Sequence, residues 1–268
     1  MKIVIKDTQK AIKFSTIIQH LKNITDKVSF YFRTTGLYIQ CMDDAHCCLF
    51  ECSISSAWFD EYTFVEGTDL ATVGLFMPLF YKVINIRHES QKLELELRDD
   101  FPDHILIHFV NSEEGGKFDK HFQLALSYID YEPMAPIPIE TIVDLTMEGK
   151  TLCDLVNQLM IFNDVVTLSF KEDMIYLISI SGDGSMKVEI KMDDVKEYAI
   201  AENTTLNQSY SLKYIQLMCQ FNKISSDITM GFSKAMPMTM KYDLGEESHV
   251  MFHLAPKLAD DEGEPGSP

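Results

Sequence analysis

One pattern occurs four times along this chain: a short amphipathic helix, a polar break, and a run in which apolar and polar residues alternate. The four units begin near Phe14, Leu79, Leu152 and Leu212, so successive starts lie 60 to 73 residues apart. That interval is too long for a solenoid repeat and leaves room for several further strands in every unit. The repeat therefore predicts an α+β protein built from two similar domains, with about one short helix to every four strands.

The first unit shows both periodicities. In the segment 14–24, the apolar residues follow the three-and-four spacing of a helix with one buried face. In the run that follows, positions 28, 30 and 32 are apolar and alternate with Ser29, Tyr31 and Arg33, so we expect a half-solvated antiparallel strand. The other units predict helices at 79–87, 152–162 and 212–221 and strands at 88–97, 163–170 and 222–232.

A proline-rich segment separates the two halves. It contains Pro133, Pro136 and Pro138, and proline fixes φ and removes the backbone donor that a strand needs. We predict an extended linker at 123–140, and this linker is rich in apolar residues. It is either a strap packed on both domains or a strap that also forms one wall of a peptide-binding groove. The remaining units are an N-terminal domain at 1–122, a C-terminal domain at 141–259 and an acidic disordered tail at 260–268.

Four of the six cysteines lie in one stretch, LYIQCMDDAHCCLFECSI, which is typical of a hairpin with DDAH at its turn. Cys48 and Cys52 share a strand face but stand about 13 Å apart at about 3.3 Å per residue. Two thiolates that each lie about 2.3 Å from one zinc ion cannot be so far apart. Cys47 and Cys48 point to opposite faces, and adding Cys41 leaves only two or three ligands without a CxxC element. We therefore expect no metal site.

The charge and the apolar runs limit the class of protein. No apolar run reaches transmembrane length and the first ten residues lack the core of a signal peptide, so we expect an intracellular protein with reduced, mostly buried cysteines. The net charge of −18 opposes binding to nucleic acid, since such binding neutralises phosphates with Lys and Arg. Net charge is a sum over the whole molecule, however, and one face of it can still be basic.

Catalytic patterns are not specified. Neighbouring aspartates occur at 43–44, 99–100 and 193–194, but neighbours in a strand point to opposite faces and do not form an acid and base pair. The chain has no GxxxxGK, HExxH or GxSxG motif, and SGDGS is typical of a hairpin turn. His46 gives the cysteines a base without an orienting group. We expect neither enzymatic activity nor a cofactor.

Two segments resemble the proliferating cell nuclear antigen (PCNA) family of eukaryotic-type sliding clamps. GLYIQCMDDAH at 36–46 matches the family pattern of glycine, alternating hydrophobic residues, Gln, Met-Asp and His, and FHLAPKLADDEGE at 252–264 resembles its L-A-P-K sequence followed by acidic residues. Between them, the fourfold repeat, the linker, the turn near Gly182 and the run MPMTMKY fall in the family's order. The resemblance thus spans the whole chain, and the two end motifs are specific in combination.

The resemblance implies a non-catalytic DNA sliding clamp. In that family each protomer has two similar domains, with two short helices of each lining a hole and antiparallel sheets outside, and three protomers form a ring around duplex DNA. The implied partners are duplex DNA, a DNA polymerase held for processive replication, a clamp loader, and repair and replication proteins with PIP-box-like peptides. The alternatives are a clamp-fold interaction module that does not encircle DNA and a subunit of a heterotrimer. The implied location is nuclear for a cellular protein and the viral replication site for a protein of a large DNA virus.

The resemblance places basic residues of the helices toward DNA phosphates, without base readout. Asp154 and the absence of Lys and Arg from 152–162, together with Ser15 and Thr16 where the family tends to carry lysines, predict a hole that is more weakly charged than is usual in the family. The candidates are Lys13, Lys22, Lys82, Arg87, Lys150, Lys213 and Lys223.

In the family, partner proteins insert a hydrophobic-aromatic plug and a glutamine beneath the linker. His253 stands where a phenol is usual, which changes the pocket's shape or its response to pH. Lys171 aligns with a lysine that some relatives use for ubiquitin-type attachment. The matching pocket positions are Met42, His46, Leu49, Ile129, Tyr131, Ile137, Pro237, His253, Ala255, Pro256 and Lys257.

Ring closure in the family pairs an edge strand of one protomer with an edge strand of the next. The resemblance assigns these roles to the alternating segments 104–110 and 185–192, and we expect both to be exposed edges in a monomer. The paired apolar face would consist of Ile105, Ile107 and Phe109 against Met186, Val188 and Ile190.

Overall fold

The computed structural model describes residues 1–67, 71–111, 118–129, 132–135, 139–234 and 236–257. The first half contains β1 (Lys2–Ile5), α1 (Thr8–Leu21), β2 (Lys27–Arg33), β3 (Gly36–Met42), β4 (Cys48–Ser55), η1 (Ser56–Trp58), β5 (Glu61–Thr63), β6 (Thr72–Phe76), α2 (Met77–Ile84), β7 (Gln91–Leu97), β8 (His104–Asn111) and β9 (Lys120–Ala125). The second half contains β10 (Val143–Glu148), α3 (Gly149–Leu159), β11 (Val165–Phe170), β12 (Met174–Ile180), β13 (Ser185–Lys191), η3 (Met192–Asp194), β14 (Glu197–Ile200), β15 (Leu206–Ser211), α4 (Leu212–Cys219), η4 (Gln220–Lys223), β16 (Asp227–Phe232), β17 (Met238–Gly245) and β18 (Ser248–Leu254).

The two halves repeat one order of elements, so the predicted α+β duplication is confirmed. All four predicted helix-and-strand units are present, with helix boundaries shifted by a few residues. The largest shift is in α1, which begins at Thr8 because the side chain of Asp7 accepts a hydrogen bond from the Lys10 N–H (2.8 Å) and caps the helix. No helix in the described part of the chain is both long and apolar enough to cross a membrane.

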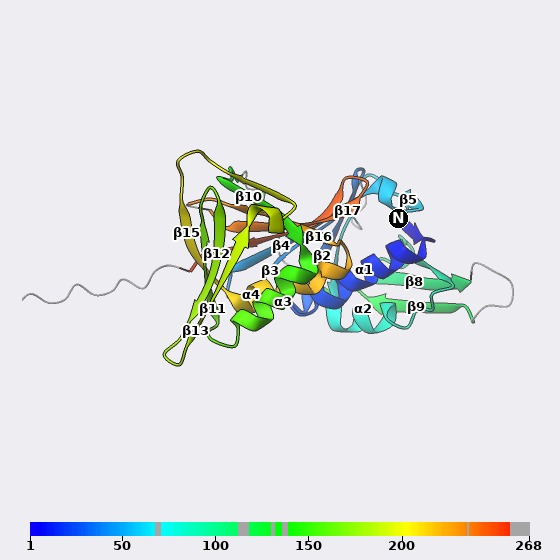
Figure 1. Cartoon of the computed structure of the whole chain (residues 1–268). Helices are drawn as coiled ribbons and strands as arrows, with labels where there is room; N and C mark the ends of the chain where they lie inside the picture. Colours follow the sequence, from blue (N-terminus) through cyan, green and yellow to red (C-terminus); the bar gives the residue numbers. More distant parts are fainter. Residues whose placement is uncertain (68–70, 112–117, 130–131, 136–138, 235, 258–268) are drawn as a thin grey trace, which may run out of the picture.

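The sheets show the same duplication. The first half forms a five-stranded sheet, β5-β1-β7-β8-β9, and a four-stranded layer, β4-β3-β2-β6. The second half forms the matching sets β14-β10-β16-β17-β18 and β13-β12-β11-β15. β18 pairs with β4 in antiparallel register, from Leu254 opposite Cys48 to His249 opposite Ser53, and joins two of these sets into one nine-stranded sheet. The two halves are therefore joined by backbone hydrogen bonds between β4 and β18 within one continuous sheet (Figure 1).

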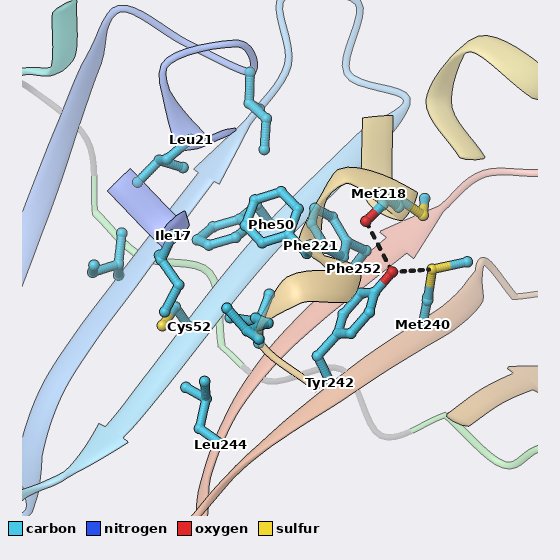
Figure 2. Packing of buried hydrophobic residues seen from close by; sticks show 14 of the residues in the cluster. Ile17, Leu21, Phe50, Cys52, Met218, Phe221, Met240, Tyr242, Leu244 and Phe252 are labelled. Carbon is cyan, nitrogen blue, oxygen red and sulfur yellow. Dashed lines mark hydrogen bonds between the residues drawn. The ribbon is translucent and has the colours of Figure 1, made fainter. Parts of the chain in front are cut away.

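A shared core crosses this junction. The Phe50 ring of β4 lies 5.3 Å from the Phe252 ring of β18 and 5.8 Å from the Phe221 ring of η4, measured between centroids (Figure 2). The hydroxyl of Tyr242 donates a hydrogen bond to the Met218 carbonyl (2.9 Å), so the one polar atom of this buried ring is satisfied. Because side chains of both halves fill the same interior, the junction between β4 and β18 is a packed core and not a surface contact.

The expectation of a half-solvated β2 is wrong. Ser29 and Tyr31, predicted on the solvent face, are only 3% and 7% exposed. Ser29 lines a groove together with Ile129 and Met134 of the linker. The linker therefore covers part of the face of β2 that points away from the core.

The linker reaches this face at Gly74 of β6. The Ser127 N–H donates a hydrogen bond to the Gly74 carbonyl (2.8 Å). A Cβ at Gly74 would lie 2.1 Å from the Ser127 carbonyl oxygen and 2.7 Å from the Ile129 side chain. Only glycine permits this close approach of two backbone segments. Gly74 thus fixes where the linker crosses the sheet.

The expectation that 104–110 forms an exposed edge is also wrong. This segment is β8, which lies between β7 and β9, and Ile105, Ile107 and Phe109 are fully buried in the core. The short strand β9 follows β8 and takes the outer position, and its presence was not anticipated. The other expected edge is confirmed, since β13 pairs with β12 and ends its sheet. β9 and β13 lie at opposite ends of the molecule (Figure 1).

The cysteine hairpin forms as predicted, by β3 and β4. Cys41, Cys48 and Cys52 are buried, and burial raises the pKa of the Cys48 thiol to about 12. Cys219 is also buried, whereas Cys47 and Cys153 are half-buried. The buried cysteines of the hairpin therefore act as small apolar side chains.

Candidate DNA and partner interfaces

The four α-helices form one face of the molecule. α1 packs against α2, α3 packs against α4, and η4 contacts α1, α3 and α4. Figure 1 shows the resulting row of helices in front of the sheets. Most apolar side chains of each helix are buried, with Ile12 and Leu79 as exposed exceptions, so mainly polar side chains lie on the outside of this row, which we call the helix face.

The helix face is basic although the chain is strongly acidic. The chain has 41 Asp and Glu residues and a net charge of −18. Within α1–α4 and η4, all of which are described, the single acidic residue is Asp154. The lysines of these five segments are Lys10, Lys13, Lys82, Lys150, Lys213 and Lys223. The helices therefore carry almost none of the protein's acidic charge, although Asp43 and Asp44 of the β3–β4 turn line a cleft together with Lys213 of α4.

The predicted cations differ in what they contact. Lys82, Lys150, Lys213 and Lys223 are exposed, and Lys13 is half-buried. The Lys22 ammonium lies 3.9 Å from the centroid of the Tyr81 ring, a cation–π contact that leaves it at the surface.

Arg87 is held more tightly. It follows α2, is half-buried, and its Nη1 donates to the carbonyls of His88 (3.0 Å) and Gln91 (2.6 Å). These bonds fix the turn that leads into β7. Arg87 therefore has a structural role that the six predicted lysines lack.

A groove lies on the side of the nine-stranded sheet that faces away from the helices, beneath the linker. Its volume is about 390 Å³. Met42 and His46 contribute from the β3–β4 hairpin, and Ile129 and Met134 contribute from the linker. The remaining lining residues are Thr25, Lys27, Val28, Ser29, Gln40 and Cys41. The groove is therefore walled by the linker, which was one of the two interpretations of this segment.

Gln40 fastens the linker to the sheet. Its side-chain amide donates to the Met134 carbonyl (3.2 Å), and its carbonyl oxygen accepts from the Met134 N–H (2.7 Å). Gln40 is 1% exposed. Because this buried side chain bonds both the N–H and the carbonyl of one linker residue, it fixes the distance between the linker and the sheet at this point.

Gln40 belongs to a buried polar network that ends at His253. Glu51 accepts hydrogen bonds from the Tyr38 hydroxyl (2.5 Å), the Gln40 amide (3.1 Å) and the His253 Nε2 (2.6 Å). The bond from His253 lowers the pKa of Glu51 most, burial opposes it, and the bonds from Tyr38 and Gln40 add to the lowering, to about 2. Glu51 is thus ionised at neutral pH beneath the linker.

Comparison with known protein families identifies the family of this chain. The model of the PCNA N-terminal domain matches residues 6–133, and the model of the PCNA C-terminal domain matches residues 139–257. The chain belongs to the proliferating cell nuclear antigen family. It is a non-catalytic DNA sliding clamp, a class of replication processivity factor.

Relatives match this clamp over nearly its full length. The proliferating cell nuclear antigen of Chaetomium thermophilum is 25% identical over 262 residues, which cover 95% of this chain and 98% of the relative. Proliferating cell nuclear antigen 2 of Plasmodium falciparum is 23% identical over 257 residues, covering 92% and 96%. Family membership implies DNA and clamp-binding proteins as partners, and PCNA homologues are nuclear in eukaryotes.

The predicted partner residues of this clamp fall into three places. Met42, His46 and Ile129 line the groove. Leu49 lies opposite Met42 across the β3–β4 pair and opposite His253 across the β4–β18 pair, so these three side chains share one face. Pro237 precedes β17, and Ala255, Pro256 and Lys257 follow β18. Tyr131 and Ile137 lie outside the described residues.

The sequence interpretation missed several residues of the groove. Met134 of the linker and Gln40 of the motif at 36–46 line the groove but are not among its predicted residues. Gln40 is a polar residue of β3 that is almost fully buried. The alternation of polar and apolar residues does not reveal this burial, because it does not show that the linker covers the polar face. Lys171, the predicted modification site, is exposed in the turn after β11.

Proposed function

We propose that this clamp encircles duplex DNA as a homotrimer, holds a DNA polymerase for processive replication, and recruits other replication and repair proteins through PIP-box-like peptides bound beneath the linker. The observation that carries the proposal is the duplicated sheet. Within the chain, β18 of one set pairs with β4 of the next. By the order of elements, β9 is the counterpart of β18 and β13 is the counterpart of β4.

This equivalence supports a head-to-tail assembly. No other described strand pairs with the outer side of β9 or β13, so both present unpaired backbone groups. Pairing of β9 with β13 of a second copy repeats the internal junction and leads to a closed ring if the rotation fits. Phe122 and Leu124 of β9 would meet Met186, Val188 and Ile190 of β13, in place of the buried residues of β8.

The first experiment is the mass of the protein in solution by light scattering over a range of concentration and salt. We expect a mass near three times 30.7 kDa, and retention on closed circular DNA that is lost when the DNA is cut. A persistent mass of 30.7 kDa would refute the homotrimer. A trimer formed only after addition of other clamp subunits would identify a heterotrimeric clamp instead.

The lysines of the helix face are predicted to contact phosphates. We expect the combined variant Lys13→Ala, Lys82→Ala and Lys213→Ala to bind DNA more weakly and with a flatter dependence on salt, by about 0.9 in the log–log slope for each contact removed. Fluorescence anisotropy with a duplex at several salt concentrations measures this slope. Lys241→Ala is the matched control, since Lys241 is exposed on β17 and shares a face with Glu51, away from the helices. Equal slopes in both variants would contradict the assignment.

The groove is predicted to bind partner peptides through Met42. We expect Met42→Ala to weaken binding of a peptide with a glutamine and a hydrophobic-aromatic plug by about tenfold, because a methionine covered by a ligand contributes about 1.5 kcal/mol. Isothermal titration with the synthetic peptide measures the effect. Met192→Ala removes a half-buried methionine of η3, outside the residues that line the groove, and should leave the affinity unchanged. An effect of the same size in both variants would exclude the groove.

A further inference from the structure

Two cysteines from different helices meet in one cleft on the helix face. Cys153 lies within α3 and Cys219 is the last residue of α4. Both line a cleft of about 440 Å³, together with Asn222 and Lys223. Cys153 is half-buried and open to this cleft, whereas Cys219 is 4% exposed and lies behind it. Neither residue has a place in the proposed DNA or peptide contacts.

The contacts of the two thiols are unequal. The Cys153 Sγ lies 3.2 Å from the Cys219 carbonyl oxygen, to which it donates, and the side-chain amide of Asn222 donates to the Cys153 Sγ at 3.3 Å. The neighbouring Cys219 side chain lowers the pKa of Cys153 against the effect of burial, and the bond from Asn222 lowers it further. The Cys153 side chain, together with burial, raises the pKa of Cys219.

We propose that Cys153 and Cys219 form a redox-active dithiol that peroxides oxidise to a disulfide within one chain. Cys153 is the attacking sulfur because it opens to the cleft and accepts a hydrogen bond from the Asn222 amide (3.3 Å), which favours its thiolate. Cys219 is the resolving sulfur because it is sheltered, lines the same cleft, and has its backbone carbonyl 3.2 Å from the Cys153 Sγ. Such reversible disulfides are the kind that occurs in reducing compartments.

The chemistry balances with hydrogen peroxide as the oxidant. The Cys153 thiolate attacks one oxygen of the peroxide, an S–O bond forms as the O–O bond breaks, and one water leaves after protonation. The Cys219 sulfur, having lost its proton, then attacks the sulfenic sulfur, the S–S bond forms, and a second water leaves. Two thiols and one peroxide thus give one disulfide and two waters. A dithiol reductant reverses the reaction.

The other cysteines do not offer this arrangement. Cys41, Cys48 and Cys52 are buried, and burial raises the pKa of each. Cys47 is half-buried, and its thiol donates a hydrogen bond to the Ala45 carbonyl (3.4 Å). The disulfide would tie α3 to the junction of α4 and η4, next to Lys223. This reaction takes place within one protomer, so failure of the trimer would leave it unaffected.

The test treats the full-length reduced protein with hydrogen peroxide, blocks the remaining thiols with N-ethylmaleimide, and maps the digest by tandem mass spectrometry. We expect a cross-linked peptide pair joining Cys153 to Cys219, lighter by two hydrogen atoms than the separate peptides and reversed by dithiothreitol. Oxidation of Cys47 before Cys153, or accumulation of the sulfinic acid of Cys153 without a cross-link, would overturn the proposal. This readout uses the unaltered chain and so does not depend on the folding of a variant.

Two variants separate the roles of the sulfurs. In Cys219→Ala, we expect Cys153 to stop at the sulfenic acid, which dimedone traps, and no cross-link to form. In Cys47→Ala, a matched loss of another half-buried thiol, the cross-link should form at an unchanged rate. A cross-link from Cys153 to any other cysteine in the Cys219→Ala protein would assign the resolving role elsewhere and refute the pairing.

Discussion

Substitution of Gln123 by proline should convert the clamp from trimers into folded monomers. Gln123 lies in the middle of β9. The Leu126 N–H donates to the Asp103 carbonyl of the neighbouring strand (2.8 Å), and hydrogen-bonding direction alternates along an antiparallel strand. The N–H groups of Leu124 and Phe122 therefore point toward β8, and the N–H of Gln123 points to the open edge. Proline at 123 removes an intersubunit donor without removing a bond of the β8–β9 pair.

The expected loss of assembly free energy in Gln123→Pro is large because the same hydrogen bond is removed at every subunit junction. A buried acceptor left without its donor costs about 1–3 kcal/mol, and the proline ring also blocks close approach of the neighbouring strand. Three such junctions in a ring cost roughly 3–9 kcal/mol, which is more than a hundredfold in the assembly constant at its lower limit. Analytical ultracentrifugation measures the loss, and circular dichroism checks that the monomer remains folded.

Gln123→Thr is the matched control, since threonine keeps the backbone N–H and suits a strand. We expect it to remain trimeric. A trimeric Gln123→Pro protein would show that β9 is not the interface strand. Lys187→Ala/Glu189→Ala is a second comparison: these exposed side chains of β13 form a surface ion pair (2.8 Å), and their removal should leave assembly nearly unchanged.

Removal of His253 should cost the protomer about 3 kcal/mol of unfolding free energy. His253 is 8% exposed and pairs with Glu51 at 2.6 Å beneath the linker. His253→Ala leaves the Glu51 side chain, which is 15% exposed, with its hydrogen bonds from Tyr38 and Gln40. Breaking a buried pair in this way costs about 3–5 kcal/mol, and the two retained hydrogen bonds place the expected loss at the lower limit. Urea unfolding in the monomeric Gln123→Pro background measures it independently of assembly.

The double variant Glu51→Gln/His253→Ala provides the control. It removes the charge together with its partner, so we expect it to be more stable than His253→Ala alone by about 1 kcal/mol or more. If the two variants are equally stable, the loss comes from the cavity left by the imidazole and not from the unpaired carboxylate.

The same pair sets an acid response. The pKa of Glu51 is lowered from its ordinary value of 4.5 to about 2, so folding favours the ionised carboxylate. Its contribution to stability is fully present above about pH 4.5 and is lost as the pH falls toward about 2. We expect the stability difference between the parent protein and Glu51→Gln to shrink over that window. A difference that stays constant with pH would show that Glu51 titrates normally.

The sequence by itself determined the local structure and the family. Periods of 3.6 and 2 placed four helices and their following strands, since side-chain burial on one face imposes those periods on any amphipathic element. Two end motifs indicated a sliding clamp. The predicted helices also contain several lysines and few acidic residues, so a basic helix face within an acidic chain could be expected from the sequence. The hairpin at 37–54 was recognised as structural because strand geometry keeps its cysteines too far apart for one metal ion.

Only the tertiary structure decided which strands are edges and what covers each face. β8 and β9 both alternate, and alternation does not tell an internal strand from an edge, because position in a sheet depends on pairing between distant segments. Alternation predicts that Ser29 and Tyr31 face solvent, and only the tertiary structure shows that this face of β2 is covered. Likewise, His253 lies 202 residues from Glu51 in sequence and joins the network of Gln40 and Glu51 only where β18 lies beside β4. Pairing across the two halves of the chain is a long-range property, and no local pattern of residues encodes it.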